Sequence, residues 1–188
     1  MKGRERIIDA AYRLFADKGY DAVGVREIAV HAGLSNPALY QHFAGKQALG
    51  VEVYRRCYVM LMEAIDERLV PGMPALDCLD AYIEAAATLH RWRPSPLLFL
   101  EDQQRLFGVI LKKEFGDKAV SARLTDWIEG GRVEGTIRTD IPTPLLVAST
   151  IGQITKWAAM SSLDLAPKSG AAQHLKALIR STLSPQTP

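Results

Sequence analysis

Five neighbouring side chains in the segment 36–42 are of types that recognise nucleic acid. Asn36 and Gln41 carry amides, while Tyr40 and His42 each carry a polar group on an aromatic ring. Amide side chains pair with adenine edges in the major groove, and the methyl group of Ala38 matches that of thymine. The surface that these residues share is polar but uncharged, which suits contact with base edges.

Two short helices joined by a glycine turn are predicted to position these side chains. Apolar residues recur at helical spacing as far as Ala32, and Gly33 follows where a helix ends in the left-handed conformation that glycine adopts cheaply. Ser35 can accept a hydrogen bond from the free amides of a second helix. Pro37 lies in the first turn of that helix, where its missing N–H costs nothing.

The same residues resemble the DNA-binding domain of TetR-type transcriptional regulators. A small residue at Ala29 is followed four positions later by glycine and then by S-x-P-A-L-Y-x-H-F-x-x-K from Ser35 to Lys46. The predicted helix 6–18, its Gly-Tyr stop, and the tetrad R-E-I-A at 26–29 also fall where the family has them. The resemblance covers about the first fifty residues closely, and the rest only in its pattern of helices.

This resemblance implies a role for each side chain. Tyr40 and Lys46 would contact phosphates, and a further set would lie against base edges or backbone: Arg26, Asn36, Pro37, Ala38, Gln41 and His42. With Ser35 they are the expected DNA-binding residues. The expected core residues of this unit are Ile28, Leu34, Leu39 and Phe43. The chain departs from the family at two helix starts, Gly24 and Gly45, because glycine is a tolerable N-cap but brings no oxygen for a phosphate contact.

The charge distribution agrees with a phosphate-facing N-terminal end. The net charge of the 188-residue chain is +2, and residues 1–46 alone hold seven Lys or Arg against five Asp or Glu. The excess therefore lies wholly in this segment. Lys2, Arg4 and Arg6 form either a short basic arm or a solvated helix start.

Composition bounds the class of protein. With 48% hydrophobic and 23% charged residues and no apolar run of membrane-spanning length, we expect a globular, cytoplasmic protein. The start MKGRERIID has no secretory pattern. Cys57 and Cys78 form no CxxC pair, which disfavours zinc or a disulfide framework; both are expected to be buried thiols, with a redox switch as the alternative.

The remaining sequence is predicted to be helical. Helices are expected over 47–69, 75–92, 97–111, 118–129, 143–163 and 170–183, after the N-terminal helix at 6–18. Gly130-Gly131 is expected to lie in a loop, and Pro185 begins a frayed tail.

The last two helices are expected to form a homodimer, as they do in the family that the chain resembles. The penultimate helix carries small residues such as Ser149 and Gly152, which let helices approach closely. The alternative is that these apolar residues belong to the core of a single chain. Helix-turn-helix proteins need two reading helices about 34 Å apart, which favours the dimer.

Large apolar and polar side chains in the central helices are candidates for a small-molecule cavity. The predicted ligand-binding residues are Tyr58, Met62, Tyr82, His90, Phe99, Gln104, Phe107, Trp127, Gln153 and Trp157. Core packing is the alternative for each. No His pair has metal-ligand spacing and no nucleophile motif is present, so neither metal, cofactor nor catalysis is expected.

The sequence thus predicts an all-α protein with a helix-turn-helix unit at 1–46 and a helical sensing and dimerisation unit at 47–188. The expected partners are a palindromic DNA operator, a small apolar effector and a second copy of the chain, with no membrane. The expected function is that of a ligand-released repressor. The alternatives are a helical protein-binding scaffold and a helical-bundle enzyme without a recognisable motif.

Overall fold

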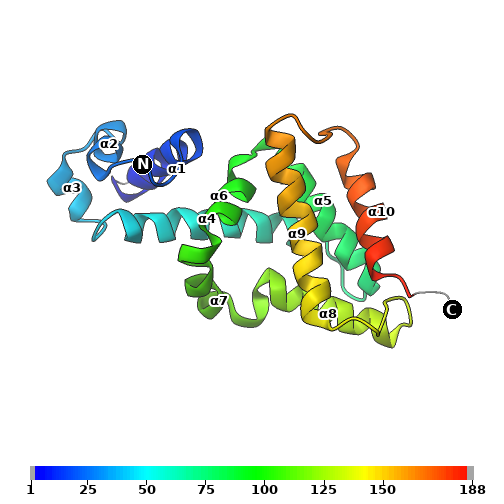
Figure 1. Cartoon of the computed structure of the whole chain (residues 1–188). Helices are drawn as coiled ribbons and strands as arrows, with labels where there is room; N and C mark the ends of the chain where they lie inside the picture. The colour runs from blue at the N-terminus through cyan, green and yellow to red at the C-terminus, as the bar shows by residue number, and fades with distance from the viewer. Residues whose placement is uncertain (1–2, 186–188) are drawn as a thin grey trace.

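The computed structural model describes residues 3–185, apart from the side chain of Lys112, and every regular element in that range is helical, as expected. The elements are α1 (Gly3–Lys18), α2 (Val25–His31), α3 (Asn36–Tyr40), α4 (Lys46–Asp66), α5 (Ala75–Trp92), α6 (Ser95–Gln103), η1 (Gln104–Gly108), α7 (Val109–Phe115), η2 (Gly116–Lys118), α8 (Val120–Val133), α9 (Thr143–Ser162) and α10 (Ala171–Leu183). Helices α1–α3 cluster at one end, and α4 runs from this cluster into a bundle of the later helices (Figure 1). Within residues 3–185, none of the helices combines the length and apolarity that a membrane span requires.

The N-terminal cluster is held by a small core to which all three helices contribute. Ile7 of α1, Ile28 of α2 and Leu39 of α3 are completely buried, and Phe43 just after α3 is nearly so. Leu34, in the turn between α2 and α3, is half-buried against the same core. The four residues expected to pack the helix-turn-helix therefore do so, and the reading helix is fixed to the other two by its apolar side alone.

Helix α4 belongs to both parts of the molecule. It packs on α1 of the N-terminal cluster and on α5 and α6 of the bundle. It ends at Asp66, three residues before the predicted end at Leu69. The amides of Arg68 and Leu69 donate to the carbonyls of Ile65 and Asp66, only three residues back, which is the tightening typical of a helix end.

The segment predicted as one helix over 97–111 is longer and interrupted. It begins at Ser95, because Pro96 lies in the first turn of α6, where its missing N–H costs nothing. It contains the π-helical turn η1 (Gln104–Gly108) and continues as α7 to Phe115. Single π turns within helices are rare and are frequent at functional sites.

The prediction of a loop at Gly130-Gly131 is wrong, since α8 continues through both residues to Val133. A Cβ on Gly131 would lie 2.5 Å from Cδ1 of Ile137. The chain that follows α8 thus folds back so closely that only glycine fits at this position. Here glycine serves close packing inside a helix instead of ending it.

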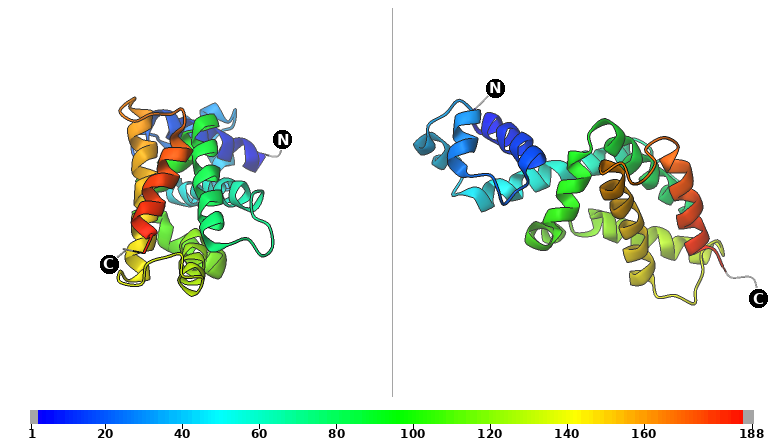
Figure 2. Two further views of the ribbon diagram at one scale, coloured as in Figure 1. Left: turned by 90° about the vertical axis from the view of Figure 1, so that its right-hand side faces the viewer. Right: turned by 45° about the horizontal axis from the view of Figure 1, so that its top comes forward.

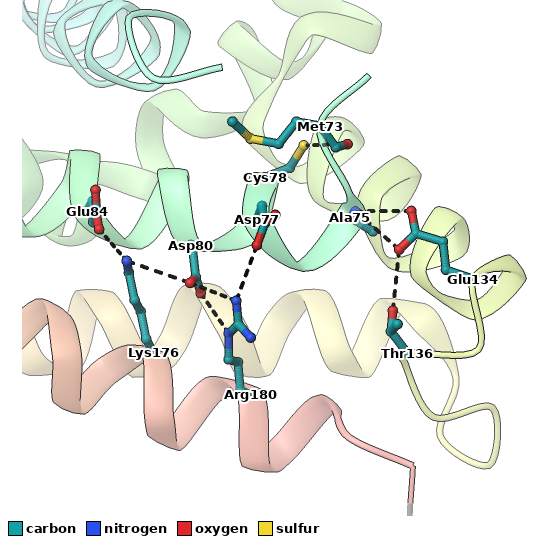
Figure 3. A network of polar contacts seen from close by, with 10 residues as sticks. All are labelled: Met73, Ala75, Asp77, Cys78, Asp80, Glu84, Glu134, Thr136, Lys176 and Arg180. Carbon is teal, nitrogen blue, oxygen red and sulfur yellow. Dashed lines mark hydrogen bonds and ion pairs between the residues drawn. The ribbon is translucent and has the colours of Figure 1, made fainter. Parts of the chain in front are cut away.

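Two cations on one side of α10 form ion pairs with acidic residues of α5 (Figure 3). Lys176 pairs with Asp80 and Glu84, and Arg180 donates to both carboxylate oxygens of Asp80, at 3.1 and 2.9 Å. Both cations therefore point toward α5. The opposite side of α10 carries the exposed side chains of His174, Leu178 and Ser181.

Candidate nucleic-acid interface and internal cavity

The start of α3 is built as predicted. The Ala38 amide donates to the Ser35 hydroxyl at 3.3 Å, and Pro37 occupies the first turn. Before this helix Gly33 has a φ of +64°, and its carbonyl accepts a hydrogen bond from Arg6 Nη2 at 3.2 Å. Arg6 thus ties α1 to the turn that joins the two helices.

Three consecutive side chains expected to contact DNA lie on the outer surface. Tyr40 is 55% exposed, and Gln41 and His42 are also exposed. Asn36 is only partly exposed, and its Oδ1 is buried without a hydrogen-bond partner among residues 3–185. Gln41 is therefore the more accessible of the two amides. The ring of His42 lies near the first residue of α1, because a Cβ on Gly3 would be 3.1 Å from its Nε2.

Lys46, the first residue of α4, has an ordered position beside this row. Its Nζ donates to the Asp21 carbonyl at 3.1 Å and lies 4.5 Å from the centre of the Tyr20 ring. An ammonium has three donors, so at least one remains for a phosphate oxygen. Gly24 and Gly45 precede α2 and α4 without a side-chain cap, as their residue type predicts.

Some of the remaining Lys and Arg side chains of the N-terminal cluster are paired with carboxylates, and others are not. Arg26 is exposed and forms no ion pair within the described range. Lys18 is paired with Glu27 at 2.6 Å, and this contact raises the pKa of Lys18. Arg4 lies over the Phe43 ring and 3.1 Å from Glu52. Arg4 and Arg6 therefore belong to a helix start instead of an extended arm; Lys2 lies outside the described residues.

A cavity of about 280 Å³ lies between α4, α5, the α6–α7 segment, α8 and α9. Three of the ten predicted ligand-binding residues line it: Tyr58, Tyr82 and Gln104. The other seven do not line it: Met62, His90, Phe99, Phe107, Trp127, Gln153 and Trp157.

Most of these seven residues have packing partners elsewhere. His90 is buried with its Nε2 2.7 Å from the Ser161 hydroxyl, and burial lowers the pKa of His90. The Trp157 ring packs edge-on against His90 and donates to the Pro167 carbonyl at 3.0 Å. Gln153 donates to side chains of α9 and α10. Met62 is part of the buried core, and Trp127 lies under the Arg123 guanidinium.

Sequence reasoning missed two notable lining residues, Tyr54 and Glu101. Helical spacing could have found both. Tyr54 precedes Tyr58 by one turn of α4, and Glu101 precedes Gln104 by one turn at the end of α6, so each shares a face with a predicted residue.

Phe107 points away from the cavity and connects the bundle to the N-terminal cluster. Its ring packs edge-on against Tyr20, with centroids 5.4 Å apart, and both rings touch Gly50 of α4. A Cβ on Gly50 would lie 2.7 Å from each ring. A second contact of this kind stacks Phe15 of α1 on Phe99 of α6, at 5.7 Å. The turn η1 thus contributes Gln104 and Gly108 to the cavity wall and Phe107 to the contact beneath Lys46.

Neither cysteine forms a disulfide, and both are buried. Burial raises the pKa of the Cys57 thiol to about 12 and also raises that of Cys78. The thiolate is the reactive form of cysteine, so Cys57 is chemically quiet at neutral pH.

The fold and this surface define a helix-turn-helix DNA-binding protein, and comparison with known proteins gives the family. The model of the family described as "Bacterial regulatory proteins, tetR family" matches residues 7–53. The chain is 38% identical over 82 residues to the HTH-type transcriptional activator FasR of Mycolicibacterium smegmatis, which covers 44% of this chain and 37% of FasR. It is 24% identical over 146 residues to the HTH-type transcriptional repressor KstR2 of the same species, covering 76% of this chain and 71% of KstR2.

A solved structure extends the likeness over the whole fold. A regulatory protein of the tetR family from Rhodococcus RHA1 has a TM-score of 0.78 and covers 100% of both chains at 22% identity. The segment 7–53, which contains α2, α3 and the start of α4, therefore belongs to the TetR family of bacterial regulatory proteins, and the chain as a whole has the fold of a TetR-family regulator.

Proposed function

We propose that the protein is a repressor that binds a palindromic operator as a homodimer and is released by a small, largely apolar effector. The observation that carries the proposal is the exposed row Tyr40-Gln41-His42 at the end of α3, a helix that is capped by Ser35 and has Lys46 beside it. Residues 1–46 would read DNA, and residues 47–188 would sense and dimerise. The chain matches KstR2 over most of the length of that protein, and KstR2 is named a repressor, which supports repression over activation.

We propose that the second copy of the chain binds to the outer faces of α9 and α10. These helices lie side by side at the end of the bundle far from α3 (Figures 1 and 2). Leu145, Ala148 and Gly152 form an exposed stripe on α9, and Leu178 is 59% exposed on α10. Lys176 and Arg180 are drawn toward α5, so their charges lie away from this face, whereas Lys156, one turn after Gly152, is exposed on α9 and would lie at the rim of the interface.

We propose that η1 transmits the binding of an effector to the DNA-binding end and so releases the protein from its operator. A molecule in the cavity would press on Gln104 and Gly108, and movement of this turn would shift Phe107 against Gly50 and Tyr20. Tyr20 lies directly beneath Lys46, so the displacement would reach a proposed phosphate contact. An effector that favours the displaced state by about 1–3 kcal/mol would lower operator affinity roughly 5- to 150-fold.

Selection of DNA fragments from the source genome by the purified protein is expected to enrich a palindromic motif. Two reading helices related by a two-fold axis require two half-sites. The affinity for the selected site should fall steeply with salt, because each neutralised phosphate releases about 0.9 counterion. Enrichment of no palindrome would contradict the proposal of a specific, dimeric repressor.

Substitutions on and beside α3 are expected to fall into two groups. Tyr40→Phe and Lys46→Ala should weaken binding to all sequences alike, because phosphate contacts carry no sequence information. Asn36→Ala and Gln41→Ala should in addition relax base preference, by about 1–3 kcal/mol for each good base contact. Binding of each variant to a library of operator variants measures both quantities. One shared pattern in all four variants would show that this division is wrong.

A further inference from the structure

The described lining of the cavity carries a negative charge and no positive charge, and this indicates which chemical class of effector would fit. Glu101 is the only charged residue among the described residues that line it. It is exposed and forms no ion pair with the side chains that the structure describes. Arg105, one turn along the chain, does not pair with it. The nearby Arg123 is engaged by Asp66 at 2.6 Å, and Arg55 by Glu114 at 2.8 Å, so neither cation is turned toward the cavity.

The position of Glu101 places this charge at the entrance. Val109 also lines the cavity and is 76% exposed, and Gln104 between them is exposed as well. The cavity therefore opens to solvent along the junction of α6, η1 and α7. Its inner wall is aliphatic, with Leu97, Leu111 and Ile154 among the buried lining residues.

The polar groups inside the cavity are neutral hydroxyls. Tyr58 accepts a hydrogen bond from the Val120 amide at 2.7 Å and keeps its own proton to donate. The hydroxyls of Tyr54 and Tyr82 have no partner within the described range. Burial, followed by the neighbouring Tyr58, Cys57 and Glu101, raises the pKa of Tyr54 to about 12, so its hydroxyl stays protonated at neutral pH. Burial raises the pKa of the adjacent Asp102 as well, and Glu101 adds to the effect.

We infer that the cavity selects a small apolar molecule whose polar end is a cationic amine, held at the entrance against Glu101. The inference rests on the proposed function, of which it specifies the effector. The apolar body would occupy the aliphatic inner wall, and the ammonium would donate to the Glu101 carboxylate. The same skeleton ending in a carboxylate would meet Glu101 with no cation among the described lining residues to compensate, and both charges would be partly desolvated. A volume of about 280 Å³ lies just below the roughly 300–1,000 Å³ typical of ligand pockets, which favours a molecule of one or two rings.

Three probes that share one skeleton test this selection: 4-phenylbutylamine, 4-phenylbutanol and 4-phenylbutanoic acid. Calorimetric titration of the full-length protein at pH 7.5 should give the tightest binding for the amine and the weakest for the acid. Glu101→Gln should weaken amine binding about five-fold, the upper range for a partly exposed ion pair, and leave the alcohol unchanged. Glu101→Lys should reverse the order of amine and acid. Glu67→Gln, which removes a carboxylate that does not line the cavity, should change none of these affinities.

Several outcomes would overturn the inference. They are binding of the acid as tight as that of the amine, an amine preference that survives Glu101→Gln, and failure of all three probes to bind at their solubility limits. DNA selection with the same preparations separates this failure from that of the proposed function. If a palindrome is enriched while the amine is not preferred, the effector class is wrong and the DNA-binding proposal stands.

Discussion

The variant Gly152→Glu is expected to be a folded monomer that binds operator no better than unrelated DNA. Gly152 is exposed on α9, and a Cβ at this position would have no neighbour within 4 Å, so the single chain has room for the new side chain. In the proposed dimer the added carboxylate would be taken out of water, and Lys156, one turn along α9, would compensate only part of the desolvation cost, so the interface would be destabilised. The loss of affinity should be at least about 10³-fold, because specific binding exceeds nonspecific binding by that factor or more.

Sedimentation velocity and operator titration measure the two effects on one preparation. Thr125→Glu provides the matched control, since it places the same charge on an exposed position of α8, away from the outer faces of α9 and α10. That variant should remain a dimer with unchanged operator affinity. If Gly152→Glu also remains a dimer, the interface lies on another face of the bundle.

Gly50→Ala is expected to lower the free energy of unfolding by about 1–3 kcal/mol, the range for an overpacked core. The added methyl group would lie 2.7 Å from both the Phe107 and Tyr20 rings, and Phe107 is completely buried. The rings would have to move apart at the contact that joins η1 to the N-terminal cluster. We therefore also expect a smaller ratio between the operator affinities measured without and with effector.

The matched control for this variant is Gly130→Ala. Gly130 is also within a helix, but the nearest atom to its Cβ would be that of Ala75, at an ordinary 3.9 Å. This variant should gain up to about 1 kcal/mol from the higher helix propensity of alanine. Equal denaturant stability of the two variants would show that the contact of Phe107, Gly50 and Tyr20 is loose and would remove the physical basis of the coupling.

The helix-turn-helix could be predicted in detail because its determinants are local. The left-handed Gly33, the capping Ser35 and the tolerated Pro37 each depend on residues within a few positions along the chain. Burial of Leu39 and Phe43 follows from their spacing of one helical turn.

The cavity could not be predicted in this way, because it depends on which helix faces meet in the bundle. Phe107 and Gln104 are three residues apart and would share a face in a regular helix, yet the π turn that contains both directs Gln104 to the cavity and Phe107 to Gly50. Gly131 is a similar case. Its role depends on the return of Ile137, which no local rule predicts.

The exposed side chains at the end of α3 would contact DNA but take little part in holding the fold together. The side chains of Tyr40 and Gln41 form no hydrogen bond within residues 3–185, and the helix is anchored by Leu39 on its opposite side. Replacing the outward residues therefore changes little in the folding free energy. If these side chains contact DNA as proposed, a duplicated copy of this gene could acquire a new operator through a few substitutions in this row while its fold stayed stable, so new regulatory circuits could evolve from this scaffold without passing through unfolded intermediates.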